Sequence, residues 1–433
     1  MVAALVPLAG AQAQSGSSDA TLYCTPGGGP LGAATDAEHN VLVGDPPLRP
    51  GVRQSRVSVD GVSTRVLQSG PRRARHAVVF VHGNPDSARD WDALAAAGSG
   101  FARMVAFDMP GFGRSDKLPA KFHTIEGGAA YIQGVLSKLG IRRAVLVLHD
   151  FGGPWGLQWA VKHKSAFAGA VLLNTGVFID YIPHALAIIW ATPTAGELEM
   201  AGTTRQSFVA GIQAVNPRPL PNDFVQLMYD YYDRAERCAI LRYYRSGRET
   251  FMTMGRDEAR ALRPLDLPAL VIWGERDPFI PPDQAEKQRQ AFPHARIVRF
   301  PDAGHWVHID SARRVRSLVV PFLRPKLTVR RPTSVQPGDR ELLVHVNVKG
   351  MLPAYGVVAR LRRGGAKVGD SGPGTPVLGT RVLTLRLSKP IRPGRYLLRV
   401  TARGLPTKAL QLRVAASSPG DGHGTGGDGD GDD

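Results

Sequence analysis

One stretch, residues 145–153 with the sequence VLVLHDFGG, constrains the fold of this chain more than any other. Its first half is an apolar run rich in Val and Leu, which predicts a buried strand. Asp150 ends that strand, and Gly152 and Gly153 then open a helical pattern. A sharp strand-to-helix turn exposes the residue at its apex above the sheet, as in the G-x-S-x-G nucleophile elbow.

Asp150 stands where the usual elbow has serine. A carboxylate can itself be a nucleophile and form an ester with its substrate. The N-terminus of the following helix stabilises negative charge, so Asp150 should stay ionised. An aspartate at this place could equally be an ordinary N-cap. This stretch alone does not separate the two interpretations.

Strand and helix patterns alternate over residues 77–173 and again over 269–323. This alternation predicts a mostly parallel, doubly wound α/β sheet, preceded by a hairpin over 55–68. Residues 177–260 are rich in aromatic side chains and lack clear strands, so we expect a helical cap there. Together these segments predict one α/β domain over 53–325.

The pattern changes from residue 326 to short alternating stretches between Pro and Gly turns, which predicts a small β-sandwich over 326–416. The net charge is +17, and 326–416 hold 18 Lys and Arg against 3 Asp and Glu. Such a basic segment could favour an anionic polymer or a cell surface. We expect no nucleic-acid binding, because no recognition motif accompanies the charge. The Gly- and Asp-rich tail, 417–433, should be disordered.

Residues 1–13 join a short apolar run to a small-x-small pattern, as signal peptides do, although a positively charged start is missing. We therefore expect a secreted or cell-surface protein, with a cytoplasmic location as the alternative. Residues 14–52 should form a loose leader. No segment has the ~20 unbroken apolar residues that span a membrane. Cys24 and Cys238 could pair in an exported chain, but nothing in the sequence places them together.

A nucleophilic carboxylate at Asp150 needs donors for the negative charge that develops during the reaction. The motif HGNP, residues 82–85, follows a predicted strand, where a backbone N–H can point at the site. We expect the backbone N–H groups of Asn84 and Phe151 to be these donors. A Gly-Pro turn alone would explain the motif equally well.

The nucleophile also needs a base that activates water and an acid that orients the base. His305, in the sequence AGHW, follows a strand and should stand at the same edge of the sheet. Asp277, in GERDP, ends another strand and is the expected partner of His305. Glu275 in the same motif is the rival acid.

In this order and spacing, HGNP, DMPGFGRSD, the HDFGG elbow, GERDPFIPP and AGHW resemble the α/β-hydrolase fold family over roughly residues 55–325. Within that family an aspartate at the elbow is similar to the epoxide hydrolase and haloalkane dehalogenase branches. The resemblance implies that Asp150 is the nucleophile, His305 the base and Asp277 its partner. It also implies an apolar small-molecule substrate and water, with no cofactor and no metal.

The two branches differ in how they treat the leaving group. Epoxide hydrolases protonate the epoxide oxygen with tyrosines, and LRYYR resembles their second-tyrosine motif, which maps onto Tyr244. The first tyrosine is not fixed by the sequence; Tyr181 and Tyr231 are the candidates. Dehalogenases resemble the chain at HGNP, where Asn84 would hold the halide, but they usually have tryptophan after the nucleophile. Phe151 has no indole N–H, which favours the epoxide interpretation.

A protein of another class stays open as an alternative. A degenerate hydrolase could serve as a secreted or surface binding protein. The intact set of Asp150, Asp277 and His305 argues against this class. Weak turnover combined with tight ligand binding would argue for it.

Overall fold

The computed structural model describes residues 24, 45–117, 120–247 and 250–416. The chain divides into two compact units, the first ending at Arg324 and the second beginning at Pro325. The predictions for 1–13 and 417–433 lie outside the described residues, as do those for most of 14–52. None of the described helices is long and apolar enough to cross a bilayer.

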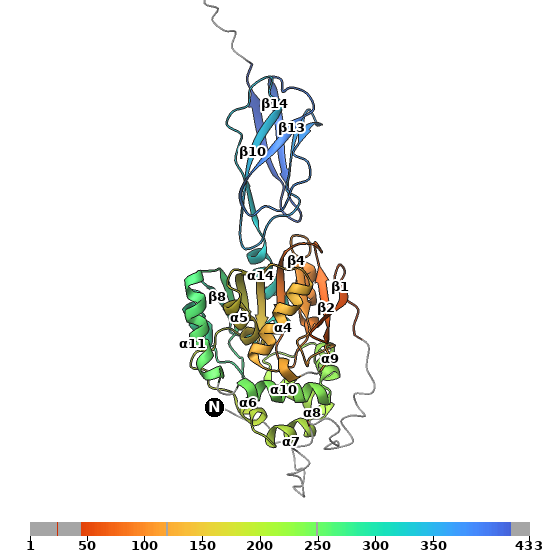
Figure 1. The fold of residues 1–433 in the computed structure, drawn as a ribbon, viewed down its shortest axis with the longest axis vertical. Helices are drawn as coiled ribbons and strands as arrows, with labels where there is room; N and C mark the ends of the chain where they lie inside the picture. The colour runs from red at the N-terminus through yellow and green to blue at the C-terminus, as the bar shows by residue number, and fades with distance from the viewer. Residues whose placement is uncertain (1–23, 25–44, 118–119, 248–249, 417–433) are drawn as a thin grey trace, which may run out of the picture. The chain divides into compact units, whose positions relative to one another are not determined.

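Within the described residues, the first unit is built on a sheet of eight strands (Figure 1). In spatial order the strands are β1 (Arg53–Val59), β2 (Val62–Ser69), β4 (Arg103–Phe107), β3 (His76–Val81), β5 (Arg143–His149), β6 (Phe167–Leu173), β7 (Ala269–Gly274) and β8 (Arg296–Phe300). β1, β2 and β4 pair antiparallel, whereas all pairs from β4 through β3 to β8 are parallel. The central strands are apolar and buried on both faces, as parallel strands usually are. The predicted doubly wound sheet is confirmed.

Helices cover both faces of this sheet. They are η1 (Ala88–Trp91), α3 (Asp92–Gly98), η2 (Ala120–Phe122), α4 (Ile125–Lys138), α5 (Gly152–Lys162), α12 (Gln284–Lys287), η4 (Gln288–Gln290), α13 (Val307–Asp310) and α14 (Ala312–Leu323). The chain moves along the sheet from β3 to β4 and then back past β3 to β5. Right-handed crossovers therefore place α3 on one face and α4 and α5 on the other. α14 packs against α3, and α4 packs against α5.

Helices also fill the sequence between β6 and β7. They are α6 (Ala185–Ala191), α7 (Ala195–Gly202), α8 (Arg205–Val215), α9 (Asn222–Tyr231), α10 (Arg234–Gly247), α11 (Thr250–Leu262) and η3 (Arg263–Leu265). Among the described residues of this segment there is no strand, in agreement with the helical pattern of the sequence. Figure 1 shows α6 to α10 grouped at one end of the sheet.

A disulfide bond joins Cys24 to Cys238 of α10. Arg242, one turn further along α10, donates from Nη2 to the carbonyl oxygen of Cys24 at 3.2 Å. The sequence left this pairing open, because the two cysteines are 214 positions apart. The bond ties a residue near the start of the chain to a helix between β6 and β7.

Residues 45–52 belong to the expected loose leader, yet the structure ties them to the first unit. Asp45 forms an ion pair with Arg65 at 2.7 Å and accepts a hydrogen bond from the Tyr231 hydroxyl at 2.5 Å. The side chain of Arg65 is completely buried and also pairs with Asp108 at 2.9 Å. A buried guanidinium requires such partners. The composition of residues 14–52 does not predict this contact, because the buried arginine that requires Asp45 as a partner lies outside that segment.

The second unit is all β, as predicted. Its described strands are β9 (Lys326–Val329), β10 (Glu341–Lys349), β11 (Val358–Arg363), β12 (Ala366–Asp370), β13 (Gly379–Leu387), β14 (Gly394–Thr401) and β15 (Lys408–Val414). They form one antiparallel sheet in the order β15-β14-β11-β12-β13-β10-β9. The two edge strands, β15 and β9, come into contact, so the sheet nearly closes around its core. Alternate residues such as Val344, Val346, Leu361 and Leu398 point into that core.

Candidate active site

Asp150 occupies the apex of a sharp turn between β5 and α5. Its φ angle is +47°, a left-handed conformation that is costly for a residue with a side chain. The neighbouring glycines leave no room for a methyl group. A Cβ on Gly83 would lie 2.3 Å from the Asp150 Cβ, and one on Gly152 would lie 2.3 Å from the Val81 carbonyl oxygen. The geometry is that of a nucleophile elbow.

The two oxygens of the Asp150 carboxylate have different surroundings. Oδ1 accepts a hydrogen bond from the backbone N–H of Asn84 at 2.8 Å. The backbone N–H of Phe151 also donates to this carboxylate. Oδ2 lies 3.5 Å from Nε2 of His305. The structure therefore brings together the carboxylate, both expected backbone donors and the expected base.

His305 is held by Asp277 through a hydrogen bond of 2.8 Å between Nδ1 and Oδ2. Oδ1 of Asp277 accepts from the backbone N–H groups of Phe279 and Ile280, and Oδ2 also accepts from Asn174 Nδ2 at 2.8 Å. Burial would raise the pKa of Asp277, but His305 and these donors lower it. Asp277 therefore stays ionised and fixes the ring.

Glu275, the rival acid, points elsewhere. Its carboxylate lies 3.4 Å from Arg299 on β8. Asp277 instead lies at hydrogen-bond distance from His305. The structure thus resolves which of the two acids in the motif faces the histidine.

Charges at the site shift the pKa values of its groups. Burial raises the pKa of Asp150, although His305, His149 and the backbone donors counteract it. Burial alone would lower the pKa of His305, but Asp277 and then Asp150 raise it to about 9. At neutral pH the ring of His305 is therefore an imidazolium, paired with the ionised Asp277.

A second buried pair supports His305 from behind, and the sequence did not predict it. His149 Nδ1 lies 2.8 Å from Asp86 Oδ2, and its Nε2 lies 3.1 Å from the carbonyl oxygen of His305. Trp306 donates from Nε1 to Asp86 Oδ1 at 2.8 Å. These bonds hold the loop backbone that carries the catalytic candidate. Asp86 directly follows the HGNP motif in the sequence.

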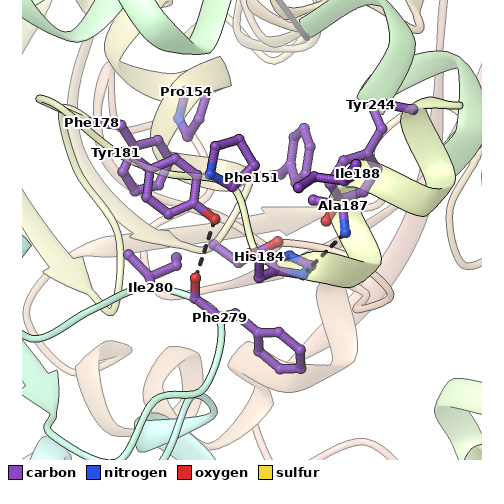
Figure 2. Close-up of a pocket in the computed structure, with 13 residues that line it drawn as sticks. Phe151, Pro154, Phe178, Tyr181, His184, Ala187, Ile188, Tyr244, Phe279 and Ile280 are labelled. Atoms are coloured by element: carbon purple, nitrogen blue, oxygen red, sulfur yellow. Dashed lines mark hydrogen bonds between the residues drawn. The ribbon is translucent and has the colours of Figure 1, made fainter. Parts of the chain in front are cut away.

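A cavity of about 230 Å³ lies next to Asp150 (Figure 2). Apolar and aromatic side chains form most of its wall. The lining residues are Asp150, Phe151, Pro154, Phe178, Tyr181, Pro183, His184, Ala187, Ile188, Ala191, Tyr244, Phe279 and Ile280. Pockets of this kind bind apolar small molecules and orient them with a few polar groups.

Tyr244 and Tyr181 both line this cavity, whereas Tyr231 does not. Asn84 donates from Nδ2 to the Tyr244 hydroxyl oxygen at 3.4 Å, so the Tyr244 proton is available to a ligand. The Tyr181 hydroxyl donates instead to the carbonyl oxygen of Phe279 at 3.2 Å, as Figure 2 shows. Of the two candidates for a first tyrosine, the structure brings only Tyr181 to the cavity.

His184 is a polar group of the cavity that the sequence did not single out. Its Nδ1 accepts from the backbone N–H of Ala187 at 3.1 Å and caps α6, so Nε2 carries the ring proton. Burial lowers the pKa of His184 to about 4, and the ring is neutral near pH 7. From the sequence alone, a histidine directly before a helix would be interpreted only as the N-cap of that helix.

Asn84 and Phe151 occupy the positions that hold the halide in the dehalogenase interpretation of the sequence. The Asn84 side-chain N–H that would hold a halide faces Tyr244. The Phe151 ring packs edge-on against Tyr244, with 5.0 Å between ring centres, and has no N–H to offer. Among the described residues, no group of three or more His, Cys, Asp and Glu side chains could hold a metal ion.

Comparison with known proteins identifies the family of the first unit. Residues 76–312 match the family model of the alpha/beta hydrolase fold. A 2-hydroxy-6-oxononadienedioate/2-hydroxy-6-oxononatrienedioate hydrolase of Burkholderia vietnamiensis is 27% identical over 61% of this chain and 93% of its own length. Epoxide hydrolase 3 of Xenopus tropicalis is 26% identical over 64% of this chain and 78% of its own.

Solved structures agree on the fold. Haloalkane dehalogenase DbeA from Bradyrhizobium elkani superposes with a TM-score of 0.54 at 18% identity, covering 62% of this chain and 97% of its own. At this level of identity the likeness shows the fold alone. With the family match over more than half of its residues, this chain belongs to the α/β-hydrolase fold family.

Proposed function

We propose that this hydrolase opens epoxides through a covalent ester on Asp150. The observation that carries the proposal is the difference between the two oxygens of the Asp150 carboxylate: Oδ1 accepts a hydrogen bond from the backbone N–H of Asn84, while Oδ2 faces His305. An oxygen held in this way is not the attacking atom. It becomes the oxyanion when water later adds to the ester carbonyl, and the Asn84 N–H is already in place to stabilise it.

The reaction balances with the groups at the site. Asp150 attacks an epoxide carbon, the ring C–O bond breaks, and the new alkoxide takes the proton of Tyr244. Once the ester has formed, the His305 imidazolium gives its proton to the Tyr244 phenolate, and the neutral ring then takes a proton from water as the hydroxide adds to the ester carbonyl. On collapse the proton of the added hydroxyl passes to the departing diol oxygen, which releases the diol and restores the Asp150 carboxylate and the His305 imidazolium. The net change is addition of one water to the epoxide.

The charge of Asp150 couples these two steps. Asp150 is one of the groups that keep the pKa of His305 at about 9. Esterification removes that charge, so the pKa of His305 falls once the ester has formed. His305 thus becomes able to accept a proton from water at the stage where a base is needed.

Tyr244 favours an epoxide over a haloalkane as the substrate. An alkoxide leaving group needs a proton donor, and the hydroxyl of Tyr244 lines the cavity with its proton available. His184 adds a neutral ring with a proton on Nε2 in the same wall. A halide needs no proton. Haloalkane dehalogenation remains the alternative, and parallel turnover assays on an epoxide panel and a haloalkane panel separate the two.

An isotope experiment tests the covalent step. In ¹⁸O-water with enzyme in excess, the first diol should carry unlabelled oxygen from Asp150, and label should enter the Asp150 carboxylate. His305→Gln should accumulate the ester, visible as a mass increase on the peptide that contains Asp150. Label in the first-turnover diol, with no adduct in the His305 variant, would show direct attack by water.

We also propose that the protein is exported and that its second unit contacts an anionic polymer. The Cys24–Cys238 disulfide supports export, because such bonds persist in oxidising compartments. The excess of Lys and Arg in 326–416 supports the polymer. Mass spectrometry of the native protein, with and without reductant, tests whether the disulfide forms in the cell.

A further inference from the structure

Five arginines share the outer face of three neighbouring strands in the second unit. We call this surface the basic face; it consists of Arg360 and Arg362 on β11, Arg395 and Arg399 on β14, and Arg413 on β15. Their strand neighbours Leu361, Leu398 and Leu412 point into the core. Because side chains alternate along a strand, the arginines all point the other way.

The register sets like charges against each other on this face. Arg360 lies directly opposite Arg399, and Arg395 lies directly opposite Arg413. Like charges in opposite positions of an antiparallel pair destabilise the sheet. The arrangement therefore has a cost in folding and needs another explanation.

Acidic side chains do not compensate these arginines. In the part of the chain that the structure describes, Arg395, Arg399 and Arg413 form no ion pair. Asp370 lies opposite Arg360, but its carboxylate already binds Lys367 at 2.8 Å. Arg395, Arg399 and Arg413 thus present guanidinium groups that no acidic side chain of the described residues pairs with.

A cavity of about 260 Å³ opens on the basic face. Arg362, Arg395 and Arg399 line it together with Gln411 and the turn at Gly364 and Gly365. Arg395 and Arg399 are two outward positions apart, about 13 Å along β14, and Arg362 on β11 lies opposite Leu397 between them. The arginines therefore form steps along an extended path, which fits a chain with repeated negative groups better than a single small anion.

We infer that the basic face binds an acidic polysaccharide, with guanidinium groups of Arg362, Arg395 and Arg399 on successive carboxylates. Guanidinium groups bind carboxylates in a bidentate, planar geometry. Between the arginines lie Leu397 and Gln411. Tyr396 also lines the cavity, but it is buried and its hydroxyl donates to the Arg392 carbonyl oxygen, so it offers no open ring on which nucleic-acid bases could stack. The inference rests on the proposed contact with an anionic polymer, and the proposed export selects a polysaccharide as that polymer.

The full-length protein with labelled polygalacturonate tests this inference. Arg362→Gln, Arg395→Gln and Arg399→Gln together should weaken binding roughly tenfold or more and flatten its salt dependence. A matched triple, Arg340→Gln, Arg381→Gln and Lys389→Gln, removes three charges on or beside β10 and β13 and should change binding far less. Neutral dextran should not bind. Epoxide turnover should be unchanged in both triples, so the hydrolase proposal stands or falls separately.

Three results would overturn the inference. Equal losses in both triples would show that overall charge, and not this face, attracts the polymer. Single-stranded DNA that binds as tightly as polygalacturonate would assign the face to nucleic acid. A lower thermal midpoint in the first triple would show that its arginines stabilise the sheet, whereas relief of like-charge pairs predicts an unchanged or higher midpoint.

Discussion

The two units handle charge in opposite ways. In the first unit the charged groups of the site are buried, and each has partners: Asp277 accepts from three donors besides His305, and Asp150 accepts from two backbone N–H groups. In the second unit arginines lie opposite arginines at an exposed face. Buried charge without compensation would prevent folding, whereas exposed charge is screened by water. In the first unit, the candidate active site is recognised by buried charged groups that all have partners. In the second unit, the candidate binding surface is recognised by exposed arginines without acidic partners.

Loss of the Tyr244 hydroxyl should give the largest effect. Tyr244→Phe removes the proton donor for the leaving alkoxide, so epoxide opening should slow by about 10- to 10⁴-fold. Stopped-flow measurement of ester formation checks this expectation. Tyr231→Phe is the matched control, because Tyr231 does not line the cavity. If Tyr244→Phe opens epoxides at the wild-type rate, as the control does, Tyr244 is not the proton donor.

The ion pair of His305 should make stability depend on pH. Its pKa is raised to about 9, so the stabilisation is fully present below the ordinary value near 6.5 and is lost as pH rises through 9. A shift of this size corresponds to roughly 3 kcal/mol. The free energy of unfolding should therefore fall from pH 6.5 to 9 more steeply in the wild type than in His305→Gln.

His294→Gln provides the control for that measurement. The side chain of His294 is 82% exposed, and its removal should leave the pH slope as in the wild type. Denaturant titrations at each pH give the required free energies. Parallel pH curves for the wild type and His305→Gln would mean that the buried pair is not ionised in the folded state.

A single arginine of the basic face should have the smallest effect, and in the opposite direction. Arg399→Gln removes the charge opposite Arg360 and should raise the free energy of unfolding by about 0.2–1 kcal/mol. Added salt should narrow the difference, because it screens the repulsion. If Arg399→Gln instead lowers the free energy of unfolding at low salt, this arginine stabilises the sheet, and the two units do not differ in how they compensate charge.

The sequence predicted the reactive residues because each follows a strand of one parallel sheet. Asp150, Asp277 and His305 come after β5, β7 and β8, and the ends of parallel strands meet at one edge. Their motifs therefore define both their place and their neighbours. The expected backbone donors, Asn84 and Phe151, follow from the same reasoning.

Residues whose role depends on packing between distant segments were not predictable in this way. His184 faces the cavity only because α6 packs near Phe279, and Asp86 reaches His149 only in the folded core. Cys24 and Cys238 carry no local signal of their meeting. In each case tertiary packing brings the two residues together, and the hydrophobic periodicity of the sequence does not predict such packing.

The crowding around the elbow has a consequence for how this protein can change over generations. Gly83 and Gly152 cannot accept any side chain without displacing Asp150 or the backbone of β3, so the reactive turn is closed to gradual variation. The opposite wall of the cavity comes from α6 and α10, through residues such as Ala187, Ile188 and Tyr244. Descendants of this chain can therefore acquire new substrates by exchanging side chains on two helices, while the turn that holds the reactive carboxylate is inherited intact.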